Sequence, residues 1–185
     1  MATKTWQLDP AHSNVEFAVK HLMIATVRGR FGNVSGSVQV DESNPLSAKI
    51  DVTIDPASID TRQEQRDAHL RSPDFFDVAQ YPNIRFVGKR LEGDPADEFR
   101  IIGDLTIRGV TKEIAVNVTN EGQGIDPWGN LRAGFSASAK IDRREFGLTW
   151  NQALETGGVV VANEIKVSVD AELFRAVEAE TKVAA

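Results

Sequence analysis

The feature that most constrains the fold is an alternation of apolar and polar residues that recurs along most of the chain. It is purest at residues 49–55, where Ile50, Val52 and Ile54 alternate with charged or polar neighbours. Successive side chains of a β-strand point to opposite faces, so a period of two indicates a strand with one buried and one solvated face. Similar segments lie at 14–21, 26–40, 84–86, 99–107, 114–118, 131–141 and 165–173. Eight such strands predict an all-β fold, either a closed antiparallel up-and-down barrel or a sandwich.

Two local signals refine this prediction. Within residues 26–40 the apolar phase is odd-numbered at Phe31 and even-numbered from Val34 onward. A bulge at Gly32-Asn33 would restore the register and bend the strand. Arg108-Gly109 stands between two alternating segments and predicts a tight hairpin turn.

One stretch, about residues 61–72, has the pattern of a helix. Thr61 and Glu64 have the spacing of a capping box, and Asp67 and Arg71 have the spacing of a helix-surface ion pair. The stretch is mostly polar and leads into a segment rich in aromatic residues. These features predict a helix that rests as a lid on the sheet.

The composition excludes several classes of protein. The chain has 27 acidic and 21 basic residues, and the bases are scattered, which argues against a nucleic-acid partner. It has no cysteine, so a disulfide, a thiol nucleophile and a cysteine-ligated metal are excluded. No apolar run resembles a signal peptide or a membrane span, so we expect a cytoplasmic protein that is not embedded in a membrane. The length predicts a single domain at 1–175 and a flexible tail at 176–185.

No arrangement of catalytic or metal-binding residues is evident. His12, His21 and His69 are the only histidines, and no two have the spacing of metal ligands. We expect His12 to belong to a turn and His69 to lie on the exposed helix surface. His21 shares the phase of Phe17 and Val19, so it is predicted to point inward, where it could bind a polar head group or reach water. No catalytic residue, cofactor or metal is therefore predicted.

The size of the barrel interior is left open by the pattern of small residues. The inward phase of 131–141 is rich in alanine, and Gly103 lies in the inward phase of 99–107. Small inward residues can leave a ligand cavity in an eight-stranded barrel. They can equally make room for large neighbours such as Phe17, Phe31 and Phe135.

Five segments carry a family pattern: WQLDPAHSNVEFAVKHL, TVRGRFGNVSG, SIDTRQEQRDAHLRSPDFFDVAQYPNIRF, GDLTIRGVTKEI and VVVANEIKVSVDAELF. Together they span roughly residues 6 to 174 and resemble the YceI-like family of bacterial polyisoprenoid-binding, lipocalin-like proteins. The resemblance implies an eight-stranded antiparallel lipocalin-like barrel with one helix across it, often in a homodimer. It also implies an apolar tunnel for a long isoprenoid, an isoprenoid quinone, a fatty-acid derivative or a similar amphipathic lipid. Many members are periplasmic or secreted, whereas this sequence predicts a cytoplasmic carrier.

The phase of the strands supplies candidate ligand-binding residues for such a tunnel. The walls are predicted from the inward phase, one opening from the aromatic segment after the helix, and the head-group contact from His21. The candidates are Val15, Phe17, Val19, His21, Phe31, Leu70, Phe75, Phe76, Phe86, Ile101, Leu105, Phe135 and Val167. For each of them plain core packing is the alternative. Two other functions stay open: an enzyme that acts on a lipid through His21 or His69, and a protein-interaction module that uses the outer strand face.

Overall fold

The computed structural model describes residues 3–176, and most of them lie in β-strands. The expected tail at 176–185 falls outside the described residues from residue 177 onward. In chain order the elements are β1 (Thr3–Leu8), β2 (Asn14–His21), β3 (Ala25–Phe31), β4 (Val34–Asp41), η1 (Pro45–Ser47), β5 (Lys49–Ile54), η2 (Pro56–Ser58), β6 (Ile59–Asp60), α1 (Glu64–Arg71), β7 (Ile84–Gly93), β8 (Glu98–Ile107), β9 (Val110–Ile125), β10 (Asn130–Asp142), η3 (Arg143–Phe146) and β11 (Glu164–Ala176). Within these residues no helix is long and apolar enough to cross a membrane.

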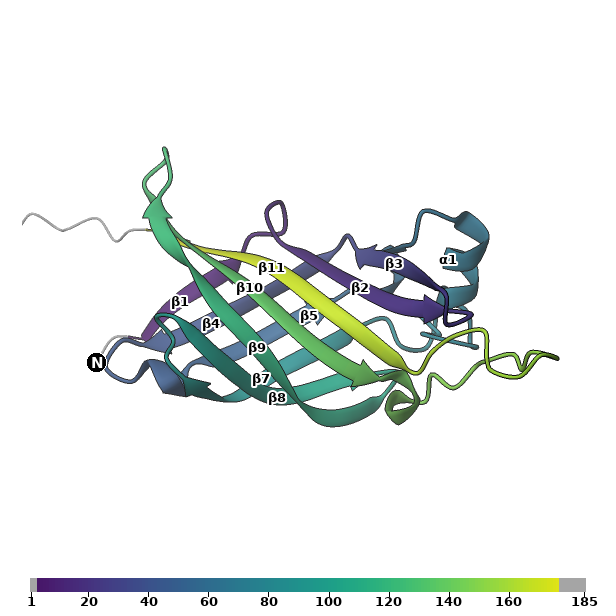
Figure 1. Ribbon diagram of the computed structural model, residues 1–185. Coiled ribbons are helices and arrows are strands. Elements are labelled where there is room, and N and C mark those ends of the chain that lie inside the picture. The colour runs from purple at the N-terminus through teal and green to yellow at the C-terminus, as the bar shows by residue number, and fades with distance from the viewer. Residues whose placement is uncertain (1–2, 177–185) are drawn as a thin grey trace, which may run out of the picture.

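Eight of the described strands close into an antiparallel barrel (Figure 1). Their order around the ring is β1-β4-β5-β7-β8-β9-β10-β11, and β11 pairs with β1 to complete it. The prediction of an eight-stranded antiparallel barrel with one helix is therefore confirmed. Closure pairs the backbone groups that an open sheet would leave exposed at its edges.

The remaining strands extend the barrel wall at one end. β2 continues in the direction of β1 and takes over the same edge of β11, and β3 then pairs with β2 and with the short β6. The prediction of one strand over 26–40 with a bulge at Gly32-Asn33 is wrong, because the chain breaks there into two strands, β3 and β4. Because of this break, β3 pairs with the extension while β4 pairs with the ring strands β1 and β5. β1, which the alternation did not reveal, holds the ring position beside β4.

The turn between β8 and β9 has the predicted geometry. Arg108 and Gly109 have φ angles of 49° and 72°, and the residues that flank them, Ile107 and Val110, pair directly. Two central residues with positive φ define a type I′ turn, whose twist matches that of the flanking strands. Glycine adopts such a φ without steric cost, which accounts for Gly109 at this position.

The helix begins three residues later than predicted, and the capping box does not form. The residue that caps α1 is Gln63, whose side chain accepts a hydrogen bond from the backbone N–H of Arg66. Thr61 precedes the helix and belongs to the segment that leaves β6. The reciprocal bonds of a capping box require Thr61 at the cap position, so Glu64 has no such partner.

The predicted ion pair between Asp67 and Arg71 is also wrong. Asp67 is buried and accepts hydrogen bonds from the backbone N–H and the hydroxyl of Thr61, at 2.9 and 2.5 Å. The guanidinium of Arg71 donates instead to the carbonyl oxygens of Ala57 and Ile59. Both side chains therefore attach α1 to the segment before it, across one end of the barrel.

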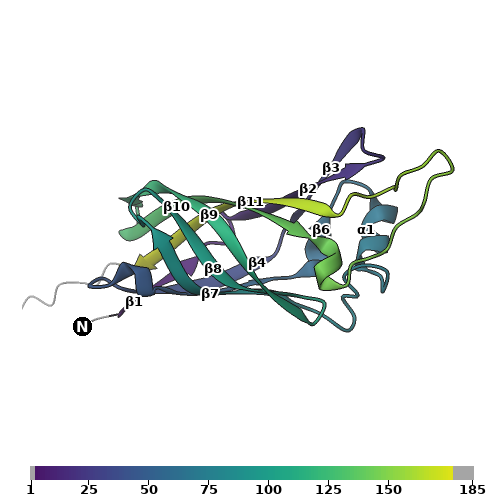
Figure 2. The same cartoon turned by 60° about the horizontal axis from the view of Figure 1, so that its bottom comes forward.

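The barrel has two different ends (Figures 1 and 2). We call the end that carries α1, η3 and the β8–β9 turn the helix end. We call the opposite end the distal end; it carries the β4–β5 connection, the β7–β8 turn and the β9–β10 hairpin. The core of buried apolar residues extends into the helix end. It comprises Val15, Phe31, Val34, Ile59, Phe75, Ile84, Leu105, Ile107, Phe146 and Leu148.

Candidate functional site

The interior of the ring contains a cavity of about 400 Å³. Every strand of the ring contributes to its wall. The principal lining residues are Trp6, Leu8, Val15, Val34, Val38, Val40, Pro45, Ile50, Val52, Ile54, Phe86, Leu91, Pro95, Phe99, Ile101, Leu105, Ile114, Val116, Val118, Ala133, Phe135, Ala137, Ala139, Ile141, Val167, Val169, Ala171 and Leu173. Pro45 and Pro95 belong to distal-end connections, so the cavity reaches that end of the barrel.

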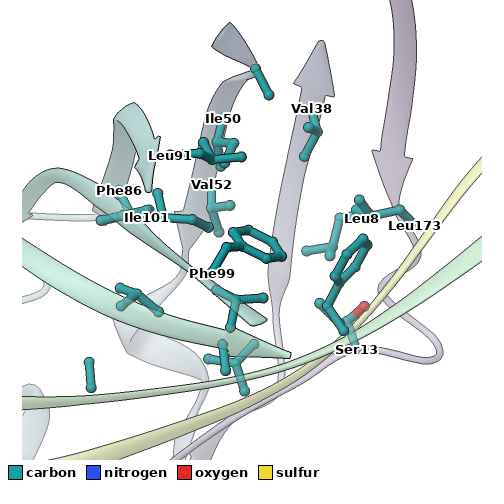
Figure 3. Close-up of a pocket in the computed structure, with 18 of the residues that line it drawn as sticks. Leu8, Ser13, Val38, Ile50, Val52, Phe86, Leu91, Phe99, Ile101 and Leu173 are labelled. Atoms are coloured by element: carbon teal, nitrogen blue, oxygen red, sulfur yellow. The ribbon is translucent and has the colours of Figure 1, made fainter. Parts of the chain in front are cut away.

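The wall of the cavity is apolar (Figure 3). Within residues 3–176 no charged side chain lines it, and the polar lining residues besides Trp6 are Ser13, Asn120, Gln123 and Ser138. The amide of Asn120 donates to the carbonyl of Pro95 at 2.9 Å, so it is already engaged in the wall. A space of this volume and lining suits a long apolar chain, because ligand pockets commonly hold about 300–1,000 Å³.

The small inward residues have two different roles. Ala133, Ala137 and Ala139 of β10 line the cavity, so here the missing side-chain volume leaves space. Gly103 of β8 makes room for a neighbour, since a Cβ at this position would lie 2.6 Å from the ring of Phe86. Both of the alternatives that the sequence left open therefore occur, on different strands.

Of the predicted wall residues, six line the cavity and three do not. Those on the wall are Val15, Phe86, Ile101, Leu105, Phe135 and Val167. Phe17, Val19 and Phe31 lie on β2 and β3, in the extension of the barrel wall, and the structure places them off the cavity. The rings of Phe17 and Phe31 pack together with centroids 5.7 Å apart. Beyond Val15, β2 and β3 extend the wall past the cavity, where Phe31 belongs to the packed core of the helix end and Phe17 packs against that core.

The three residues predicted to cover an opening lie at the helix end. Phe75 is buried in the core, and Leu70 and Phe76 pack against it. The ring of Phe76 meets that of Phe31 edge to face at 5.8 Å. These side chains close the helix end, and none of them lines the cavity.

Neither histidine considered for chemistry lines the cavity. His21 ends β2, is half-buried and pairs with Ala25, while the neighbouring Lys20 is exposed. His69 is half-buried rather than exposed, because its ring lies edge to face with those of Phe75 and Trp150. Its Nε2 lies 2.8 Å from a carboxylate oxygen of Asp74.

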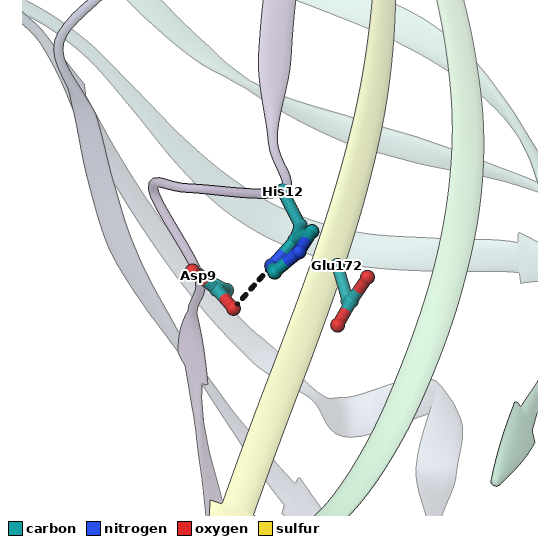
Figure 4. A group of neighbouring side chains, drawn as sticks. All are labelled: Asp9, His12 and Glu172. Atoms are coloured by element: carbon teal, nitrogen blue, oxygen red, sulfur yellow. Dashed lines mark hydrogen bonds and ion pairs between the residues drawn. The ribbon is translucent and has the colours of Figure 1, made fainter. Parts of the chain in front are cut away.

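His12 belongs to a charged cluster on the outer surface (Figure 4). Its Nδ1 lies 2.9 Å from Asp9 Oδ2, and the ligand atoms of Asp9, His12 and Glu172 lie within 4.8 Å of one another. Three such groups could in principle hold a metal ion. The guanidinium of Arg132, however, already contacts both Asp9 and Glu172 and supplies the positive charge between them. The cluster therefore forms an ion-pair network that joins the β1–β2 connection to β10 and β11.

The electrostatics of this network are those of stable ion pairs. Hydrogen bonds from His12 and Arg132 lower the pKa of Asp9 to about 2, against the opposing effect of burial. The same hydrogen bond to Asp9 raises the pKa of His12 above 6.5. Burial opposes ionisation of Asp126, but hydrogen bonds from Asn130 and Arg132 lower its pKa to about 2.

Several cavity residues were not among the sequence-based candidates. Ile50 and Val52 belong to the purest alternating segment, so their inward phase could have placed them on the wall. Trp6 and Leu8 were missed because β1 is short and was not recognised as a strand. Phe99 shares the phase of Ile101 and Leu105 and could have been found by the same rule.

Comparison with known proteins agrees with this architecture. The chain is 39% identical over 165 residues to a UPF0312 protein of Staphylococcus aureus, which covers 89% of this chain and 94% of that protein. The crystal structure of BcnA from Burkholderia cenocepacia superimposes with a TM-score of 0.77 at 25% identity, and covers 89% of this chain and 98% of that one. A polyisoprenoid-binding domain from Saccharophagus degradans, implicated in plant cell wall breakdown, matches with a TM-score of 0.64. Its identity is 15%, over 91% of this chain and 97% of that one, so this match bears on the fold alone.

The sequence resemblance extends through all the elements that build the cavity. The family model described as "YceI-like domain" matches residues 6–173, from Trp6 on β1 to Leu173 on β11. These two residues lie on the strands that close the ring and both line the cavity. The chain therefore belongs to the YceI-like domain family.

Proposed function

We propose that this protein binds and carries a long-chain isoprenoid or a similar amphipathic lipid in its barrel cavity, without chemical turnover. The observation that carries the proposal is a cavity of about 400 Å³ with no charged side chain in the described part of its wall. An apolar chain placed there is removed from water, and each buried CH₂ contributes about 0.8 kcal/mol. The polyisoprenoid named for the Saccharophagus degradans domain makes isoprenoids the first ligand class to test.

The shape of the barrel suggests how such a ligand would lie. The helix end is filled by buried side chains such as Phe31, Phe75 and Phe146, while the cavity reaches connections at the distal end. The polar lining residues Asn120 and Gln123 are near this distal end, in the last third of β9. We therefore expect the apolar tail to point toward the helix end and the head group to lie at the distal end.

Extraction of the purified protein tests whether a lipid is carried. Protein produced in a bacterial host, washed without detergent, is extracted with organic solvent, and the extract is analysed by mass spectrometry. We expect a long-chain lipid at a fixed stoichiometry. A protein that yields no lipid, and binds neither farnesol nor a longer polyprenol when these are added, contradicts the proposal.

A substitution that fills the cavity tests whether the barrel interior is a binding site or a packed core. Ala137 lies mid-strand on β10 and lines the cavity, opposite Val118 and Val169. We expect Ala137→Trp to fold with near-native stability and to lose its lipid, because the added ring occupies empty space. In a packed core the same change would cost about 1–3 kcal/mol through overpacking. The control is Ala115→Trp, on the exposed face of β9, which should leave lipid binding intact.

The other functions have less support from the positions of residues. His21 and His69 do not line the cavity, so they are poorly placed to act on a lipid bound there. The most exposed large apolar residues, such as Ile24 and Trp128, lie on hairpin tips rather than on the outer strand face that an interaction module would use. The cytoplasmic location, the homodimer and the absence of a nucleic-acid partner stay predictions; fractionation, sedimentation and a binding assay with DNA and RNA check them.

A further inference from the structure

Arg175 continues the inward-facing row of β11 at the distal end of the barrel. Ala171 and Leu173 of this strand line the cavity. Arg175 is the next residue in the same phase, because side chains two positions apart lie on one face of a strand. It pairs with Leu131 of β10. The β-strand thus places a cation directly after the last apolar position of the cavity wall.

The guanidinium of Arg175 lies beside a residue of that wall. Its central carbon is 5.2 Å from the ring centroid of Trp6, and Trp6 lines the cavity. Lys4 shares the inward phase of Trp6 on β1 and pairs with Val40, another lining residue. Two cationic side chains therefore flank Trp6 where the apolar wall ends.

The hydrogen-bonding capacity of Arg175 is not used by the described residues. Its side chain is 20% exposed, yet its Nε is buried and has no hydrogen-bond partner among residues 3–176. Within the described part of the chain the nearest carboxylate oxygen, in Glu42, is 3.8 Å from Nη2, and the side chain of Glu42 is 63% exposed. A buried donor without a partner loses its hydrogen bonds to water and gains none in return, and the loss is larger when the donor is charged, so such a group calls for an explanation.

Two other arginines that are shielded from solvent, Arg132 and Arg143, have close acceptors. Arg132 contacts the carboxylates of Asp9, Asp126 and Glu172. Arg143 donates to four backbone carbonyls around η3 and the segment before β11. Arg175 differs from both, because among the described residues it has no close acceptor at the mouth of an apolar cavity.

We infer that Arg175, with Lys4 beside it, binds the anionic head group of the lipid whose chain occupies the cavity. The head group is a carboxylate or a phosphate, since a guanidinium donates two parallel hydrogen bonds to either. Trp6 separates the head-group site from the apolar chain and holds the guanidinium plane by a cation–π contact. The inference rests on the proposed function and narrows it from amphipathic lipids in general to acidic ones.

Three ligands with one chain and different heads test the inference. Dissociation constants of farnesol, farnesoate and farnesyl monophosphate are measured with the full chain by calorimetry at low ionic strength. We expect at least one of the two acids to bind about tenfold more tightly than farnesol, the effect of one charge-assisted hydrogen bond. The acid that gains more identifies the head group as carboxylate or phosphate.

Variants of Arg175 test whether this residue causes the tighter binding of the acidic ligand. Arg175→Gln should bind farnesol as the unmodified protein does and lose the tenfold preference for the acid. Arg175→Lys keeps the charge without the two parallel donors, so it should retain part of the preference. The control is Arg28→Gln on the exposed surface of β3, which removes one positive charge away from the cavity and should retain the whole preference.

The outcomes separate the two proposals. Equal affinities of the unmodified protein for all three ligands would overturn the head-group site and leave lipid binding intact. A preference that persists in Arg175→Gln would also overturn it, because another group then binds the head. Failure of all three ligands to bind overturns the proposed function together with this inference. If Arg175→Gln does not fold, the affinities of the unmodified protein and of Arg175→Lys for the three ligands decide whether Arg175 binds the head group.

Discussion

At the scale of single residues, Gly103 shows how closely two ring strands of the barrel approach one another. A Cβ on Gly103 would lie 2.6 Å both from the ring of Phe86 and from the carbonyl oxygen of Val87. Neither β7 nor β8 can move away without losing the hydrogen bonds between them. The position therefore requires glycine because of its neighbours, although no positive φ is involved.

We expect Gly103→Ala to lower the free energy of unfolding by about 1–3 kcal/mol, because the added methyl group overpacks against Phe86. Urea denaturation followed by tryptophan fluorescence measures the change. Gly134→Ala on β10 is the control, since its Cβ would meet nothing closer than 3.7 Å. The double variant Gly103→Ala, Phe86→Leu should recover part of the loss. Equal stability of the two alanine variants would contradict this account.

The lowered pKa of Asp9 predicts that the stability of the protein depends on pH. Its pKa is about 2 in the folded protein and 3.8 ordinarily, so the unfolded chain binds the proton more strongly. The stabilisation is therefore complete above about pH 4 and is lost as the pH falls toward 2. Asp9→Asn should be less stable than the unmodified protein at pH 5, and the difference should shrink on acidification. A constant difference from pH 5 to pH 2 would contradict the assignment.

His12, the hydrogen-bond partner of Asp9, contributes to stability with the opposite dependence on pH. The pKa of His12 is raised above 6.5 by Asp9, so its contribution is present below that pH and is lost as the pH rises through the raised value.

Strand phase predicted neither Asp9 nor His12, because both lie in a connection where the alternation stops. Strand phase was informative only within the strands, where the inward phase placed Phe86, Ile101 and Phe135 on the cavity wall.

At the scale of elements, α1 depends on one buried carboxylate rather than on the capping box that its sequence suggests. Asp67 accepts both polar hydrogens of Thr61 and so fixes the entry of the chain into the helix. The guanidinium of Arg66 donates to the hydroxyl and the carbonyl of Thr61 from the other side. The spacing of Thr61 and Glu64 matched a common helix start, but tertiary contacts placed Thr61 outside the helix.

Asp67→Ala is expected to lower the free energy of unfolding by about 1–3 kcal/mol, because it leaves buried donors of Thr61 without an acceptor. The control is Glu64→Ala, which removes the residue predicted to complete a capping box. It lies on the exposed surface and should change stability by less than about 0.5 kcal/mol. Thermal and chemical denaturation of the pair give the comparison. The reverse order of effects would restore the capping-box interpretation.

The strands themselves were more predictable than the helix. The purely alternating segment at 49–55 became β5, and the phase change at Gly32-Asn33 became the break between β3 and β4. β1 was not predicted, since its apolar residues Trp6 and Leu8 are too few to establish a period. Its place in the ring depends on pairing with β11, far away in the sequence, which a local pattern does not contain.

At the scale of the whole molecule, stability and binding are expected to depend on opposite ends of the barrel. The helix end is filled, with Phe146 at 0% exposure, and the cavity extends toward the distal end. Phe146→Ala should therefore lower the free energy of unfolding by about 3–5 kcal/mol, as for other buried aromatic residues. At a temperature where this variant is folded, its affinity for the lipid should be unchanged.

Phe99→Ala provides the matched variant at the cavity. Its side chain lines the cavity and meets the ring of Phe135 edge to face at 6.2 Å. We expect its truncation to alter lipid affinity more than Phe146→Ala does, and to destabilise the protein less, since one side of the ring already faces space. Calorimetric binding and urea denaturation of both variants test this. Loss of binding in Phe146→Ala under folding conditions would contradict the separation.

The closure of the ring has a consequence for how the protein is made. From β4 to β11, each ring strand pairs with the ring strand that follows it in sequence, so hairpins can form in order as synthesis proceeds. The pairing of β1 with β11 joins residues 7 and 8 to residues 173 and 174, and it requires nearly the whole chain. Until residues 164–176 leave the ribosome, the growing sheet has two free edges and an uncovered apolar face. The nascent chain is therefore most prone to aggregate just before β11 emerges, and this is the stage at which a chaperone would protect it.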